Sequence, residues 1–372
     1  MNGGLYMYEK RYGRLNDVLQ EMNCEWAFIV SPVHIHYYSG FQSDPHERFF
    51  ALLFDTNKNR TYLFLPELDY EKAKLRANVD DIIPVSDTDD GYEVVKQTIG
   101  TDVKSVAIEK NVMTVFNLEQ LRSTFSNIKI ESIDSFIAKE RMRKSKAEIE
   151  QTKKAIEITE QGLAHIVNFV QVGMTEIEIK MELEFYLQSL GAEKMAFDTL
   201  VLTGENSALP HGVSGLRKVQ KGDFLLFDFG VTVNGYHSDI TRTFIIDSGT
   251  QEQQNIYETV KEANERAIQA AKEGNQVKHI DIVAREYIES HNYGKFFTHR
   301  TGHGLGLEVH EEPSIHAKNE LVISKGMLFT IEPGIYIPSI GGVRIEDNIY
   351  INETGQTEVL TTYSKALTYI EG

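Results

Sequence analysis

The chain has 372 residues, a hydrophobic content of 41% and a formal net charge of −17. This length and apolar content suit two globular domains with separate cores, and no apolar run is long enough to span a bilayer. The negative charge disfavours binding to nucleic acid and anionic lipid, and a single cysteine, Cys24, excludes an intrachain disulfide, so we expect a cytoplasmic protein.

The first third of the chain alternates between predicted strands and predicted helices. Strands are expected at residues 25–30, 48–54, 61–65 and 105–109, and helices at residues 8–22, 68–77 and 117–124. This alternation indicates a small α/β domain. We place that domain at residues 1–132 and assign residues 133–372 to a larger catalytic domain.

The larger domain is predicted to begin with two capped helices. Ser145 with Glu148, and Thr175 with Glu178, have the spacing of capping boxes. Apolar residues recur every seven positions after the first cap, which gives that helix one buried face: Ile149, Ile156, Leu163 and Val170. Further helices are expected at 251–273 and 279–290, followed by a strand pair, "GMLFTIEPGIYI" and "GGVRIEDNIYI". The domain would then repeat the order helix, helix, hairpin.

The stretch "FDFGVTVNGYHSDITRT" is predicted to form a hairpin that carries two carboxylates. The Asn-Gly pair at residues 234–235 favours a two-residue type I′ turn. With that loop, Asp228 faces Thr241 and Gly230 faces Asp239. The two aspartates become diagonal neighbours on one face, roughly 7 Å apart, close enough to hold shared cations. The alternative is that both carboxylates face solvent.

Two histidines and two more carboxylates accompany the hairpin. His303 and His310 stand in "TGHGLGLEVHEEP", whose glycines favour a loop or strand edge over a helix. Glu332 and Glu346 have apolar neighbours, where an unpaired carboxylate would be costly. Each also has an ordinary interpretation: a buried structural histidine, a solvated turn acid, or an ion pair of Glu346 with Arg344. Together, four carboxylates and one imidazole favour Mn²⁺, Co²⁺ or Zn²⁺ in a two-metal hydrolase centre.

In this order, the motifs resemble those of the pita-bread metallopeptidases, and most closely those of bacterial Xaa-Pro dipeptidases (prolidases). The matching stretches are "DFG", "SDITRT", "GHGLGLEVHEEP", "IEPG" and "RIED". The resemblance implies an α+β protein with a C-terminal pita-bread catalytic domain and a smaller N-terminal creatinase-type α/β domain. It also implies a homodimer that hydrolyses small peptides with proline in the second position. Two divalent ions, with Mn²⁺ expected and Co²⁺ or Zn²⁺ as alternatives, would bind to Asp228, Asp239, His303, Glu332 and Glu346.

The same resemblance implies roles for residues around the metals. Glu332 would also move the proton of the attacking water, and His310 would contact the scissile carbonyl or the proline side of the substrate. His211, in "LPHGV", would stabilise the tetrahedral intermediate. The stretch "YYSGFQSDPHERFFAL" resembles a loop that reaches the partner's active site in bacterial Xaa-Pro dipeptidases, with an ordinary polar loop as the alternative. Its candidate substrate-binding residues are Asp44, His46 and Arg48.

One position departs from the family pattern. Some prolidases carry an arginine directly after the proline of the "HExP" segment, where it holds the substrate carboxylate, whereas this chain has Ser314. A dipeptidase would then need another cation for that carboxylate. The sequence offers His211, His310, Arg344, or His46 and Arg48 from a second copy.

Three other functions occur on this fold. An Xaa-Pro aminopeptidase would share the metal centre but leave the downstream pocket open. A creatinase-like amidinohydrolase would lack the metal ligands, and a non-catalytic binding protein would have lost some of them. Because all five ligand positions carry ligand residues, the sequence favours a peptidase.

Overall fold

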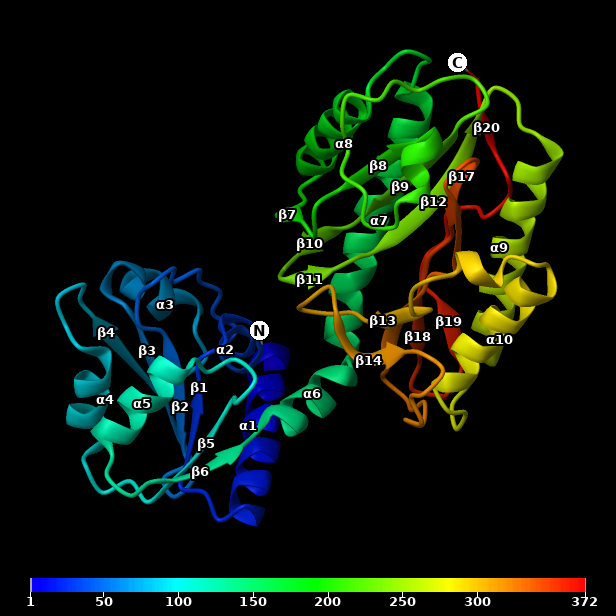
Figure 1. Ribbon diagram of the computed structural model, residues 1–372. Coiled ribbons are helices and arrows are strands. Elements are labelled where there is room, and N and C mark those ends of the chain that lie inside the picture. The colour runs from blue at the N-terminus through cyan, green and yellow to red at the C-terminus, as the bar shows by residue number, and fades with distance from the viewer. Residues whose placement is uncertain (1, 372) are drawn as a thin grey trace. The chain divides into compact units, whose positions relative to one another are not determined.

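The computed structural model describes residues 2–371, and the chain divides into two compact units, Met1–Lys139 and Glu140–Gly372. Both units combine helices with β-sheets, which confirms the predicted α+β class (Figure 1). Within the described residues, no helix has the length and apolar character needed to cross a membrane.

The first unit is built on one six-stranded sheet with the order β4-β3-β2-β1-β5-β6. Its strands are β1 (Trp26–Ile29), β2 (Ala51–Asp55), β3 (Arg60–Pro66), β4 (Asp81–Val85), β5 (Ser105–Ile108) and β6 (Lys129–Ser132). Its helices are α1 (Asn2–Glu21), α2 (Pro32–Ser39), α3 (Tyr70–Arg76), α4 (Gly91–Ile99), α5 (Val115–Thr124) and α6 (Asp134–Met142), which crosses into the second unit. Sheet residues such as Phe28 and Phe64 pack with Val95 of α4 and Leu121 of α5 to form the core.

The four strands predicted for this unit are present, whereas the patterns do not predict the edge strands β4 and β6. Both edge strands are largely half-exposed and mix charged with apolar residues, and β4 contains Pro84, so neither resembles a buried strand. The helix predicted at 68–77 is a short 3₁₀ turn, Glu67–Asp69, followed by α3.

The second unit contains two packed pairs of helices. They are α7 (Lys146–Phe169) with α8 (Glu176–Ser189), and α9 (Gln251–Ala270) with α10 (Lys278–Ser290) (Figure 1). Both predicted capping boxes form, because Ser145 and Thr175 each exchange hydrogen bonds with the glutamate three residues later. The four residues of the seven-residue repeat, three on α7 and Val170 directly after it, are all buried.

Each helix pair packs against its own sheet. The sheet β20-β12-β9-β8 shares a core with α7 and α8, and the sheet β14-β13-β15-β18-β19 shares a core with α9 and α10. The strands are β7 (Lys194–Met195), β8 (Leu200–Thr203), β9 (Phe224–Phe229), β10 (Val231–Val233), β11 (Tyr236–His237), β12 (Ile240–Ile246), β13 (Gly302–Gly304), β14 (Glu311–Ile315), β15 (Leu328–Ile331), β16 (Gly334–Ile337), β17 (Gly341–Arg344), β18 (Asp347–Ile351), β19 (Thr357–Val359) and β20 (Tyr369–Ile370). The order helix, helix, strands therefore occurs twice.

The predicted strand pair near the C-terminus is divided into two pairs. β15 pairs with β18, and β16 pairs with β17, so each predicted strand is interrupted once. Glu332 and Pro333 lie at the first break, and Ile345 and Glu346 lie at the second. Pro333 has no N–H to donate to a ladder, which accounts for the first break. Both interruptions coincide with carboxylates that the sequence singles out.

The hairpin has the predicted register. Asp228 pairs with Thr241, and Asn234 and Gly235 form the loop with φ angles of 48° and 80°. A Cβ atom at Gly230 would lie 1.8 Å from the carbonyl oxygen of Ser238. Glycine is therefore required here because the backbone that leads into Asp239 passes directly over it.

We expect Gly230→Ala to lower the free energy of unfolding by about 1–3 kcal/mol, because the clash is with backbone that cannot rotate away. The measurement is the denaturant midpoint. Gly13→Ala on α1 is the matched control: no atom lies within 4 Å of its Cβ, and alanine should raise stability by about 0.5–1 kcal/mol. An unchanged midpoint for Gly230→Ala would contradict the close approach.

Candidate metal centre

The five predicted ligands all line one cavity of about 560 Å³ in the second unit. Asp228 lies on β9, Asp239 directly precedes β12, His303 is in β13, Glu332 follows β15 and Glu346 separates β17 from β18. These segments belong to both large sheets of the unit, so the cavity lies where the two sheets meet.

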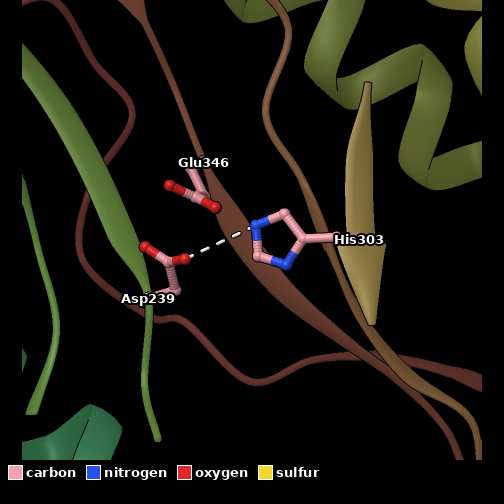
Figure 2. Close-up of side chains that lie close together, drawn as sticks. All are labelled: Asp239, His303 and Glu346. Carbon is pink, nitrogen blue, oxygen red and sulfur yellow. Dashed lines mark ion pairs between the residues drawn. The ribbon is translucent and has the colours of Figure 1, made fainter. Parts of the chain in front are cut away.

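Three of these side chains form the tightest group. One ligand atom from each of Asp239, His303 and Glu346 lies within 4.8 Å of the other two, and Figure 2 shows the side chains pointing at one another. His303 Nε2 is 3.6 Å from Asp239 Oδ2 and 3.4 Å from Glu332 Oε1. His303 in β13 and Glu332 after β15 come from one sheet, and Asp239 before β12 comes from the other. The imidazole of His303 therefore lies among carboxylates from both sheets.

The tautomer of His303 follows from its other ring nitrogen. Nδ1 lies 3.1 Å from the carbonyl oxygen of Gly304, which can only accept, so Nδ1 carries the proton. Burial, with His310 nearby, lowers the pKa of His303 to about 3, so the ring is neutral at physiological pH. Its Nε2 therefore presents a lone pair to carboxylate oxygens, an arrangement that is stabilised by a cation between them or by a proton on one carboxyl group.

The carboxylates show the same need for a cation. Three buried oxygens have no hydrogen-bond partner among the described residues: Asp228 Oδ1, Asp239 Oδ1 and Glu346 Oε1. Burial and the neighbouring carboxylates raise the pKa of Asp239 and of Glu346 well above the ordinary value. Burial also raises the pKa of Glu332 to about 7, although Arg344 opposes the shift. Divalent cations fit this donor set because they would neutralise the crowded charges and occupy the unpartnered oxygens.

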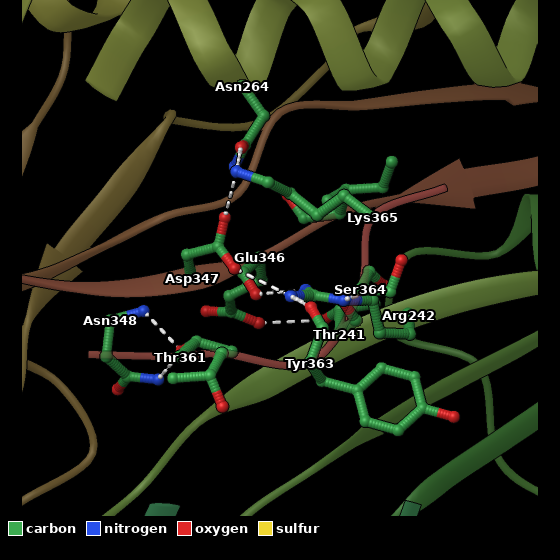
Figure 3. Close-up of polar contacts among 12 residues, drawn as sticks. Thr241, Arg242, Asn264, Glu346, Asp347, Asn348, Thr361, Tyr363, Ser364 and Lys365 are labelled. Atoms are coloured by element: carbon green, nitrogen blue, oxygen red, sulfur yellow. Dashed lines mark hydrogen bonds and ion pairs between the residues drawn. The ribbon is translucent and has the colours of Figure 1, made fainter. Parts of the chain in front are cut away.

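Glu346 is held in place by its neighbours. Thr241 Oγ1 donates to Glu346 Oε2 at 2.7 Å, which leaves Oε1 facing the cavity. Arg242, which is 1% exposed, donates to the backbone carbonyl of Glu346 at 2.6 Å and to Asp347 Oδ1 at 2.7 Å (Figure 3). Lys365 Nζ lies 2.9 Å from the other oxygen of Asp347. Two adjacent acids therefore differ: Asp347 is fully ion-paired and Glu346 is not.

Arg344 is bound within the chain. Its guanidinium forms an ion pair with Asp228, donates to the Tyr336 hydroxyl at 2.7 Å and donates to Thr241 Oγ1 at 3.1 Å. The ordinary interpretation of Glu346 as the partner of Arg344 is wrong, because the carboxylate that Arg344 contacts belongs to Asp228. Arg344 lines the cavity, but its contacts to Asp228, Tyr336 and Thr241 already engage all three of its nitrogens.

The two other predicted histidines also line the cavity. The ring of His310 meets the ring of His303 edge-on, with the centroids 4.3 Å apart. Burial and the charge of Arg300 lower the pKa of His310. His211 lies on the loop after the 3₁₀ turn Gly204–Ala208 and is exposed at the rim. Both rings can therefore meet a molecule that enters the cavity.

Asp44, His46 and Arg48 lie in the first unit, between α2 and β2. Asp44 and His46 are exposed, and Arg48 Nε donates to Asp87 Oδ1 at 2.7 Å. The described residues that line the cavity all come from the second unit, so these three are not among them.

His299 and Arg300 also line the cavity, although no motif in the sequence singles them out. His299 Nε2 lies 2.8 Å from the hydroxyl of Tyr336, and burial lowers the pKa of His299 to about 4. Their position in the sequence could have indicated this, because both directly precede "TGHG" and lie within four residues of the predicted ligand His303.

Comparisons with known proteins agree with this geometry. Residues 150–353 match metallopeptidase family M24, and residues 11–143 match the creatinase/prolidase N-terminal domain. An uncharacterized peptidase of Staphylococcus aureus (strain MW2) is 38% identical over 355 residues, which cover 95% of this chain and 99% of the relative. These matches confirm the predicted resemblance and the two-domain pita-bread fold.

Solved structures match over nearly the whole chain. A Xaa-Pro dipeptidase from Bacillus anthracis has a TM-score of 0.90 at 32% identity and covers 97% of this chain and 99% of its own. A prolidase from Pyrococcus furiosus has a TM-score of 0.86 at 36% identity, with 94% and 99% covered. An X-Pro aminopeptidase from Thermotoga maritima has a TM-score of 0.86 at 35% identity, with 94% and 98% covered.

Proposed function

Because the chain belongs to metallopeptidase family M24, we propose that it is an Xaa-Pro dipeptidase, which hydrolyses dipeptides with proline in the second position. The observation that carries this proposal is the group of buried carboxylate oxygens without partners around a neutral imidazole. Solved structures titled Xaa-Pro dipeptidase and prolidase, which match over almost the entire chain, support the choice of substrate.

Two divalent ions, with Mn²⁺ as the expected metal, would be held by the five residues that line the cavity: Asp228, Asp239, His303, Glu332 and Glu346. When bound, such ions would lower the pKa of a water molecule from ~16 towards ~7 and polarise the substrate carbonyl. Asp239 and Glu346 would be central to holding the ions, because each has one oxygen without a partner in the tightest part of the group.

The protein's own side chains would carry the proton and the developing charge. Glu332 would accept the proton of the attacking water on its carboxylate and return it to the proline nitrogen as the C–N bond breaks. This transfer is needed because the nitrogen leaves as an amine only when it gains a proton. His310 and His211 would donate N–H groups to the carbonyl oxygen as it gains negative charge.

A second copy of the chain is part of the proposal. Asp44 and His46 are exposed on the first unit, and we propose that they and Arg48 reach the cavity of a partner in a homodimer. Sedimentation of Asp44→Ala/His46→Ala should then show an intact dimer, and steady-state kinetics of the same variant with Leu-Pro should show a raised KM.

A second candidate function is an Xaa-Pro aminopeptidase, which the match to the Thermotoga maritima structure favours about as strongly. The two candidates share the same chemistry and differ only in whether the substrate may contain further residues after its proline. Substrate length therefore separates them.

We expect the Mn²⁺-loaded protein to hydrolyse Leu-Pro with a higher kcat/KM than Leu-Pro-Gly, and to leave Leu-Ala uncut. The protein is first stripped of metal and then reloaded with Mn²⁺, Co²⁺ or Zn²⁺. Efficient cleavage of Leu-Pro-Gly would identify an aminopeptidase instead. If no reloaded form cleaves either proline peptide, the proposed function is wrong.

A further inference from the structure

Two arginine residues line the cavity, and they differ in what they contact. Arg344 is paired with Asp228 and is buried. Arg300 is half-buried and, among the residues whose side chains the structure describes, forms no ion pair with a carboxylate. Its side-chain contact is a hydrogen bond from Nη1 to Ser314 Oγ at 3.2 Å. Arg300 thus brings to the cavity a positive charge that no described carboxylate contacts directly, although this charge also lowers the pKa of Glu332.

The position of Ser314 fixes where the guanidinium of Arg300 lies. Ser314 is on β14, directly opposite His303 in the antiparallel pairing of β13 with β14. Arg300 therefore extends along the same edge of the metal centre, and its charge lowers the pKa of His310. Ser314 is also the position at which some prolidases carry an arginine. In this chain the guanidinium next to that position belongs to Arg300 instead.

We propose that Arg300 binds the free carboxylate of the substrate's proline, and that Ser314 positions the guanidinium for it. Ser314 accepts from one donor, and the remaining N–H groups of the guanidinium can meet both oxygens of a carboxylate. Arg344 is already bound by Asp228, Tyr336 and Thr241. This inference rests on the proposed function, and it explains how a dipeptide is distinguished from a longer peptide, whose proline ends in an amide.

The test compares Leu-Pro with leucyl-prolinamide, which lacks the negative charge, on Mn²⁺-loaded protein. Arg300→Met should lower kcat/KM for Leu-Pro about 30-fold or more, mainly through KM, because a charged partner in a partly buried site is lost. The same variant should change kcat/KM for the amide less than about 3-fold. Calorimetry with free proline gives a readout that does not depend on hydrolysis, and Arg300→Met should weaken proline binding by a similar factor.

The exchange variant Arg300→Ser/Ser314→Arg provides the matched control. It moves the guanidinium from the segment before β13 to β14, and we expect it to recover at least about 10-fold of the kcat/KM that Arg300→Ser alone loses on Leu-Pro. Equal losses on Leu-Pro and the amide, or unchanged proline binding by Arg300→Met, would overturn the inference. If wild-type protein binds proline through Arg300 but cleaves neither peptide, the proposed function fails while the binding role of Arg300 stands.

Discussion

Glu346→Gln is expected to abolish hydrolysis of Leu-Pro and to reduce the bound metal, because it removes the oxygen that has no partner at the centre of the site. The metal-free variant should nevertheless be more stable than the metal-free wild type, by about 1 kcal/mol or more. The reason is that burial and nearby carboxylates raise the pKa of Glu346, so its charge opposes folding until a cation binds. Turnover, metal content and the denaturant midpoint of the metal-free protein are the measurements.

Asp347→Asn is the matched control because it changes the next residue in the chain. Asp347 is paired with both Arg242 and Lys365, so the amide should destabilise the protein by about 3–5 kcal/mol. The two variants are thus predicted to shift the midpoint in opposite directions. Near-normal turnover with full metal content in Glu346→Gln would show that the ligand assignment is wrong.

His310→Ala should lower kcat for Leu-Pro about 100- to 1,000-fold while leaving the metal content unchanged. The ring of His310 lines the cavity and meets His303 edge-on, so it can donate to the substrate without being a ligand. His291→Ala, at an exposed position after α10, should leave kcat unchanged and serves as the control. Loss of metal from His310→Ala would instead make His310 a ligand, and retained turnover would remove its role.

Local sequence patterns predict the helix starts and the hairpin register of the second unit, because each of these features depends on interactions between residues that are close in the chain. The capping boxes at Ser145 and Thr175 begin their helices as expected, and the turn at Asn234 sets the register that pairs Asp228 with Thr241. The edge strands β4 and β6 are not predicted, since pairing with a neighbour stabilises them rather than their own apolar pattern. The break at Glu346 likewise depends on strand pairing, because β17 pairs with β16 and β18 pairs with β15, whereas Pro333 accounts for the break after Glu332.

The charged groups of the site illustrate a different limit of sequence reasoning. Motifs indicate that Asp228 and Arg344 both belong to the cavity, but not that they are bound to each other. Arg344 thus already has a carboxylate partner, whereas Arg300, which no motif singles out, has none within ion-pair distance among the described residues. Asp228 and Arg344 are more than a hundred positions apart in the sequence. Only the folded structure therefore shows which charged residues are paired with each other.

Arg242 restricts the stage of translation at which the second unit can be completed. Its guanidinium donates to the carbonyls of Thr241, Glu346, Tyr363 and Ser364 and to the carboxylate of Asp347, so four of its five acceptors belong to residues synthesised at least a hundred positions later. Before those residues leave the ribosome, burial of β12 would enclose a charge without partners. Nascent chains should therefore keep this strand accessible to chaperones, and hydrolytic competence should arise in one late step after residue 364 has left the ribosome.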